Sequence, residues 1–142
     1  MQSLSFVPGR AFLTSDSPQA PWSVVFEDEG SAGYFYACDR SQTTLEGSIL
    51  DGILDAMLIY NVSAFQNLEN ERLAAIEWSR DGMQAVLYLD GTAQALFDFQ
   101  AREGYCRTNF PNFLSETGDT WRKSSHAWSD EVFERFEASL YA

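Results

Sequence analysis

Two Asp-Gly pairs, Asp81-Gly82 and Asp90-Gly91, constrain the fold of this chain more than any other feature of its sequence. They separate three runs of apolar and β-favouring residues within 73–99. Asp-Gly is the strongest short-range signal for a β-hairpin, because glycine readily adopts the positive φ angles of a tight turn. The sequence therefore predicts a three-stranded antiparallel meander. Its middle strand, 83–89, alternates poorly between apolar and polar residues, which predicts a strand covered on both faces.

The third strand of the meander contains one acidic residue. Side chains alternate across a strand, so Phe97 and Phe99 share one face while Leu96 and Asp98 share the other. An acidic residue on a mainly apolar strand faces either water or a partner. For Asp98 the solvent is the favoured interpretation.

The N-terminal region favours further strands. Residues 22–26 and 34–38 are rich in β-favouring residues and flank a loop with two glycines, which predicts a hairpin. Glu27-Asp28-Glu29 opens that loop. Apolar residues within 6–13 predict a short strand, and the nearby prolines place it at a sheet edge, because proline cannot donate a ladder hydrogen bond.

Residues 49–62 carry two conflicting signals. Apolar side chains recur at helical spacing, with Ser48 as a possible cap, whereas Gly52 weakens a helix and the residues after Leu58 favour a strand. We predict a helical turn or short helix over 48–54 that leads into a strand over 56–62. A strand throughout is the alternative.

The chain ends in a predicted helix, 130–141. Ser129 is in position to cap it, and Trp128 and Phe133 have the spacing of a hydrophobic staple. The apolar stripe of this helix consists of Val132, Phe133, Phe136 and Leu140.

These elements predict an α+β fold. It consists of a mainly antiparallel sheet of five to seven strands, including the meander, with the C-terminal α-helix packed on it. The 142 residues suit a single domain, 1–142, which buries roughly 70% of the surface of its unfolded chain.

The charge of the chain restricts its partners. Nine Lys and Arg stand against 21 Asp and Glu, which gives a formal net charge of −12. This charge argues against binding to nucleic acid or to anionic membranes, because both require clustered positive charge. A basic protein partner would be attracted. The alternative is that the charge only keeps an aromatic-rich domain soluble.

The cysteines and the N-terminal residues indicate the cellular compartment that we expect for the protein. Two cysteines, Cys38 and Cys106, do not make a disulfide scaffold. The N-terminal residues lack the basic start and apolar run of a signal peptide, and no apolar segment has the ~18 residues needed to cross a membrane. We therefore expect a soluble, reduced, cytoplasmic protein.

The best candidate for a binding site is the segment 102–126, where cations and aromatic residues are concentrated. Arg recognises carboxylates or phosphates in a bidentate manner, and Tyr and Trp provide rigid contact area. The candidate ligand- or partner-binding residues are Arg102, Tyr105, Arg107, Asn109, Trp121 and Arg122. The alternative is that these Arg pair with the chain's own carboxylates while the aromatic residues fill the core.

Catalytic and metal sites have weaker signals. Cys106 and His126 form a candidate nucleophile and base, but no motif of a known cysteine enzyme surrounds them, and we predict no catalytic residue. Glu27-Asp28-Glu29 offers oxygen ligands without the spacing of a calcium loop, so a solvated hairpin tip is the favoured interpretation. We predict no metal and no cofactor.

Several stretches together resemble a family of uncharacterised bacterial proteins, domain of unknown function 2251. They lie within 25–62, at 78–82 and at 104–111, and include Gly33-Tyr34-Phe35-Tyr36-Ala37 and Gly104-Tyr105-Cys106-Arg107-Thr108-Asn109-Phe110-Pro111. The resemblance implies a small bacterial domain, expected in the cytoplasm, and brings no assigned activity.

Three hypotheses of function follow. The first is a non-enzymatic protein-binding module that masks a basic partner, as an immunity or inhibitor protein masks a toxin. The second is a small-molecule-binding protein or enzyme with a pocket formed by the segment 102–126. The third is a self-associating homo-oligomer that uses an uncovered sheet face.

Overall fold

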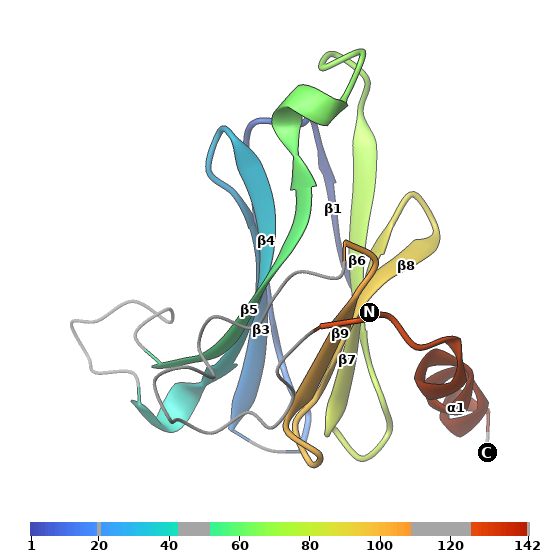
Figure 1. The fold of residues 1–142 in the computed structure, drawn as a ribbon. Coiled ribbons are helices and arrows are strands. Elements are labelled where there is room, and N and C mark those ends of the chain that lie inside the picture. Colours follow the sequence, from blue (N-terminus) through green and yellow to red (C-terminus); the bar gives the residue numbers. More distant parts are fainter. Residues whose placement is uncertain (20, 43–51, 109–125, 142) are drawn as a thin grey trace.

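A computed structural model describes residues 1–19, 21–42, 52–108 and 126–141 (Figure 1). The nine strands of these residues form two antiparallel sheets that face each other as a sandwich. The five-stranded sheet has the order β1 (Gln2–Phe6), β6 (Arg72–Trp78), β7 (Gln84–Leu89), β8 (Thr92–Asp98) and β9 (Glu103–Cys106). The four-stranded sheet has the order β2 (Ala11–Asp16), β3 (Trp22–Asp28), β4 (Ala32–Asp39) and β5 (Ile53–Asn61). The short helices η1 (Arg40–Gln42) and η3 (Val62–Ala64) follow β4 and β5.

The predicted meander is confirmed as β6, β7 and β8. Asp90 and Gly91 form the second turn with φ angles of 51° and 83°. Two successive positive φ values are typical of the hairpin turn that matches the twist of the flanking strands. Gly82 in the first turn has φ 72°, a backbone conformation that favours glycine.

The main core lies between the two sheets. Phe26 and Phe35 extend into it from the four-stranded sheet, and Ile76, Leu87 and Phe97 from the five-stranded sheet. The Phe35 and Phe97 rings stack across the interface with centroids 5.1 Å apart. Phe97 and Phe99 lie on one face of β8, as the alternation predicts, and that face points into this core.

The helix α1 (Asp130–Leu140) covers the outer face of the five-stranded sheet (Figure 1). Phe136 is fully buried against Val86, Leu96 and Tyr105. Both faces of β7 are therefore covered, as its sequence predicts. The predicted N-cap is also confirmed, because the Ser129 side chain accepts a hydrogen bond from the Val132 backbone N–H. The rings of the predicted staple, Trp128 and Phe133, lie 5.7 Å apart.

The α+β class with a C-terminal helix is confirmed, but the strands are more numerous than the five to seven predicted and belong to two sheets. The N-terminal residues form two strands instead of one. A turn at Val7–Arg10, where Gly9 has φ 111°, directs β1 and β2 into different sheets. Each of the two is an edge strand, as the nearby prolines predict.

Residues 53–61 form a strand, so the strand alternative is confirmed there. Ile53 and Leu54 already belong to β5 and are not helical. Pairing with β4 overrides the helical spacing of the apolar residues, because it gives hydrogen-bond partners to the backbone groups on the β4 side of β5. The first part of the predicted helical turn, 48–51, lies outside the described residues.

Candidate functional site

Asp55 and His126 form a buried pair at the sandwich edge where β5 and β9 come together. The His126 Nε2 atom lies 2.8 Å from Asp55 Oδ2 and 3.0 Å from Oδ1, and both side chains are almost completely buried. The His126 carbonyl accepts a hydrogen bond from the Cys106 backbone N–H at 2.8 Å. His126 therefore connects the edge of one sheet to a carboxylate of the other.

Gly104 of β9 makes this close approach possible. A Cβ atom at this position would lie 2.9 Å from Asp55 Oδ2 and 3.0 Å from His126 Cδ2 and from the Phe97 ring. A larger residue would therefore push the pair away from β9. The pair is packed against backbone and excludes solvent, which favours a role in closing the sandwich over a role in catalysis.

Cys106 lies beside His126 in the backbone pairing, but the two side chains contact different groups. The Cys106 thiol is buried and lies 3.2 Å from the Thr108 hydroxyl, which donates a hydrogen bond to the Leu58 carbonyl at 2.6 Å. His126 Nε2 contacts Asp55. A substrate would have to displace packed core to reach either group. Cys38 is also a free and buried thiol, and burial raises its pKa to about 12.

The described residues of the predicted site 102–126 do not converge on one pocket. Tyr105 is buried beneath α1, and its O–H donates to the Glu103 carboxylate. Burial, followed by this hydrogen bond, raises the Tyr105 pKa above its ordinary value. Arg107 places its guanidinium 4.2 Å from the centre of the Trp128 ring and donates from Nε to the Ala93 carbonyl at 2.9 Å.

Tyr105 and Arg107 thus contact the segment that carries α1. Tyr105 fills the core, as the alternative interpretation expects, whereas these contacts of Arg107 are with a ring and a carbonyl and not with a carboxylate. Arg102 is exposed in the turn between β8 and β9, at the opposite end of β9 from Arg107. The other three candidates, Asn109, Trp121 and Arg122, lie outside the described residues.

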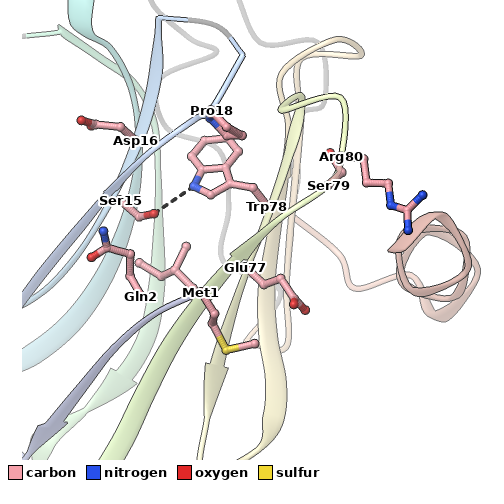
Figure 2. Close-up of a pocket in the computed structure, with 10 residues that line it drawn as sticks. Met1, Gln2, Ser15, Asp16, Pro18, Glu77, Trp78, Ser79 and Arg80 are labelled. Carbon is pink, nitrogen blue, oxygen red and sulfur yellow. Dashed lines mark hydrogen bonds between the residues drawn. The ribbon is translucent and has the colours of Figure 1, made fainter. Parts of the chain in front are cut away.

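A cavity of about 430 Å³ lies where β1 begins and where β2 and β6 end. In Figure 2 the Trp78 indole extends toward Ser15 as one of the lining side chains, and the indole N–H donates to the Ser15 hydroxyl at 2.9 Å. The charged side chains of Asp16 and Arg80 point away from the cavity on opposite sides (Figure 2). The cavity therefore has an aromatic wall but no convergent charged groups.

A second cavity, about 320 Å³, lies at the other end of β6. Its lining combines buried apolar side chains with Arg72 and Asp90, which form an ion pair at 3.1 Å. Within this cavity, therefore, a cation and an anion directly contact each other.

The outer face of the four-stranded sheet presents aromatic and acidic side chains. Phe12, Glu27, Tyr34 and Leu58 occupy neighbouring positions across all four strands, and Tyr36 follows in the next row. Phe12 is 50% exposed, and the rings of Tyr34 and Tyr36 stack with centroids 6.0 Å apart. We call these five residues the tyrosine face.

The tyrosine face is electrostatically negative. The pKa of Tyr36 is raised to about 12, first by burial and then by the negative charge of Glu27, with smaller effects of Tyr34 and Glu29. Carboxylates near a phenol oppose its ionisation, because deprotonation adds a like charge. The same carboxylates would attract a cation to this face.

The acidic residues of the Glu27-Asp28-Glu29 run have different environments in the structure. Glu27 lies on the outer face, whereas Asp28 is buried and accepts hydrogen bonds from the Gly9 N–H and the Tyr60 O–H, both at 2.6 Å, and from the Gly30 N–H at 2.9 Å. Its donors show that Asp28 stabilises a junction of loops. Among the described residues no group of three or more His, Cys, Asp or Glu side chains has the arrangement of a metal site.

Sequence reasoning missed the pairing of Asp55 with His126. The signal was present, because a strand over 53–61 places Asp55 on the same face as Met57 and Ile59, and an acidic residue in register with core residues requires a buried partner. Helical spacing of the apolar residues would instead place Asp55 on the opposite face from them. The tyrosine face was missed although Tyr34-Phe35-Tyr36 alternates, because the pattern alone does not tell which face is covered.

Comparison with known proteins places the chain in a family. A model of an uncharacterised protein conserved in bacteria, domain of unknown function 2251, matches residues 6–137. An uncharacterised protein of Haemophilus influenzae is 36% identical over 90 residues, which are 63% of this chain and 52% of that protein. The chain thus spans about half the length of this curated relative.

No solved structure matches the chain. No helix in the described ranges is long and apolar enough to span a membrane. The family match covers nearly the whole chain and confirms the resemblance seen in the sequence. The chain belongs to the bacterial family of domain of unknown function 2251.

Proposed function

We propose that this protein is a non-enzymatic binding module whose tyrosine face binds a basic protein partner. The observation that carries the proposal is the asymmetry of the two sheets. α1 covers the outer face of the five-stranded sheet, whereas no described helix or strand covers Phe12, Tyr34 and Tyr36 on the other sheet. Phe12 is half-exposed and the two tyrosines are partly exposed, and aromatic side chains that stay accessible on a regular sheet are typical of binding surfaces.

The chemistry of the tyrosine face specifies the partner. Tyr anchors provide large, rigid contact area, and their ring faces attract Lys and Arg side chains. Glu27 lies in the same face and Glu29 follows close by, so cations receive both ring faces and carboxylates. The net charge of −12 speeds association with a positively charged protein at low salt.

The alternative of an enzyme finds less support in the described residues. The Asp55–His126 pair and Cys106 are buried, and Tyr105 and Arg107 are engaged in contacts beside α1. A masking role, as in an inhibitor or immunity protein, requires no catalytic group. We further expect the protein to function in the reducing cytoplasm, and the free buried thiols Cys38 and Cys106 agree with this.

The test is a pull-down from native cells at low salt with three baits. They are the wild type, the double variant Tyr34→Ala/Tyr36→Ala, and a control with Glu131→Ala/Glu134→Ala on the exposed side of α1. We expect a basic partner that binds the wild type and the control, is released by high salt, and binds the tyrosine variant at least tenfold more weakly.

Circular dichroism would establish that all three baits are folded. A partner retained equally by the tyrosine variant would contradict the assignment of this face. Failure of folded wild type to retain any basic protein would contradict the proposed function.

A further inference from the structure

The cavity beside Arg72 combines an apolar interior with a charged mouth. Phe6, Ile59 and Leu89 line it, and Phe6 and Ile59 are at least nine-tenths buried. Arg72 and Asp90 lie at the exposed side, where 32% and 46% of their side-chain surfaces are accessible. Its volume of about 320 Å³ lies at the lower end of the range of small-molecule sites.

The two charges at the mouth are held in place. Arg72 Nη1 lies 3.1 Å from Asp90 Oδ2, and the guanidinium carbon lies 4.7 Å from the centre of the Phe65 ring. Asp90 Oδ1 accepts a hydrogen bond from the Leu73 backbone N–H at 3.0 Å. Asp90 also has the positive φ of the tight turn, which fixes its backbone. The cation and the anion are thus positioned before any ligand binds.

Both charged groups retain capacity for further hydrogen bonds. A guanidinium has five N–H donors, and the pair with Asp90 uses Nη1. The buried Nε of Arg72 has no hydrogen-bond acceptor among the described residues. Each carboxylate oxygen of Asp90 accepts one bond from the donors above and has a second lone pair. A ligand can therefore add to the ion pair without breaking it.

We propose that this cavity binds a small zwitterion with an apolar side chain, that is, a free aliphatic or aromatic amino acid. Its carboxylate would accept from the Arg72 guanidinium, its ammonium group would donate to Asp90, and its side chain would enter the space beside Phe6, Ile59 and Leu89. Asp90 repels a simple carboxylate, and Arg72 repels a simple amine. The zwitterion alone satisfies both charges.

The Gln94 amide and the Thr92 hydroxyl also line the cavity and offer neutral hydrogen bonds to the ligand. This site lies apart from the tyrosine face, because its residues belong to the ends of β1, β5 and β7, to the starts of β6 and β8, and to the loops beside them. Binding of a small molecule in this cavity is therefore independent of partner binding at the tyrosine face, and each can be tested separately.

Isothermal titration calorimetry with the full chain tests the proposal. The probes are L-leucine and L-phenylalanine, with 4-methylpentanoate lacking the ammonium group, isopentylamine lacking the carboxylate, and glycine lacking the side chain. We expect leucine or phenylalanine to bind at least tenfold more tightly than each of these three comparators. Equal affinity for either singly charged comparator, or no binding of leucine and phenylalanine up to ~10 mM, would overturn the proposal.

Variants locate the site. Arg72→Gln and Asp90→Asn should each weaken binding at least tenfold, whereas the matched control Arg102→Gln, in an exposed turn, should bind as the wild type does. Leu89→Trp fills the cavity and should abolish binding without removing a charge. Thermal unfolding identifies the variants that fold, and amino-acid binding that persists in folded Leu89→Trp would contradict this location.

Discussion

The two outer faces of the sandwich are built from similar residues but have different neighbours. On the five-stranded sheet, Val86, Leu96 and Tyr105 are buried beneath Phe136 of α1. On the four-stranded sheet, Phe12 and the two tyrosines remain partly accessible, beside Glu27 and with no described helix or strand above them. The difference shows that apolar content alone does not tell which outer face α1 covers.

The position of α1 on the outer face of the five-stranded sheet depends on contacts between residues that are far apart in the sequence. His126 bonds to Asp55 on the opposite sheet, and Arg107 stacks on Trp128 just before α1. These contacts fix the chain that enters α1, so that the helix reaches its face in one orientation. The tyrosine face carries the charged side chain of Glu27 instead, and a charged carboxylate favours contact with water.

Truncation of one phenylalanine on each face should give the largest difference. Phe136→Ala should lower the free energy of unfolding by about 3–5 kcal/mol, because it leaves a cavity beneath α1. Phe12→Ala, at a half-exposed position, should cost less than about 1 kcal/mol. Urea unfolding monitored by circular dichroism measures both values. A similar loss of unfolding free energy in the two variants would mean that both faces are equally important for folding, which would contradict the difference between them.

Substitution of the buried pair should give an intermediate effect. Asp55→Asn keeps the size of the side chain but removes the charged acceptor of His126, which should cost about 1.5–3 kcal/mol. Asp16→Asn, at an exposed surface ion pair with Arg40, is the matched control and should change stability by at most about 1 kcal/mol. The same urea experiment applies. If Asp55→Asn is as mild as its control, the pair does not hold the edge closed.

The smallest effect concerns the ionisation of Tyr36. The folded-state pKa of about 12 lies above the unfolded value near 10, so this group stabilises the protein fully below pH 10, and the contribution is lost as the pH rises to 12. Glu27→Gln should lower the Tyr36 pKa by a fraction of a unit, because it removes a nearby negative charge.

NMR or ultraviolet titration measures the Tyr36 pKa, with Tyr36→Phe to assign the signal. Tyr88 also has a pKa raised to about 12, chiefly by burial, but lies on the other sheet and should not respond to Glu27→Gln. A Tyr36 pKa that is unchanged in Glu27→Gln would show that Glu27 does not set the potential of this face.

Local signals in the sequence sufficed for the elements whose structure depends on neighbours in the chain. The Asp-Gly turns predicted β6 to β8, and Ser129, Trp128 and Phe133 predicted the start of α1. In each case the physical cause lies within a few residues, as positive φ in a turn or as a side-chain cap.

The sequence did not predict the division into two sheets or the Asp55–His126 pair, because both depend on distant contacts. Gly9 permits the turn between β1 and β2, but nothing near it indicates that the two strands join different sheets. The role of Arg107 was ambiguous for the same reason, since an arginine beside aromatic residues suits a ligand site and a ring of its own chain equally.

The pairing of β1 with β6 has a consequence for synthesis of the protein. β2 to β5 follow one another in sequence and in space, so the four-stranded sheet can assemble by successive hairpin-type pairings as the chain leaves the ribosome. β1 pairs with β6 in a register that joins Gln2 to Ile76, and therefore waits for some seventy residues, several seconds at ~5–20 residues per second. During that interval the unpaired backbone of β1 is open to pairing with other chains.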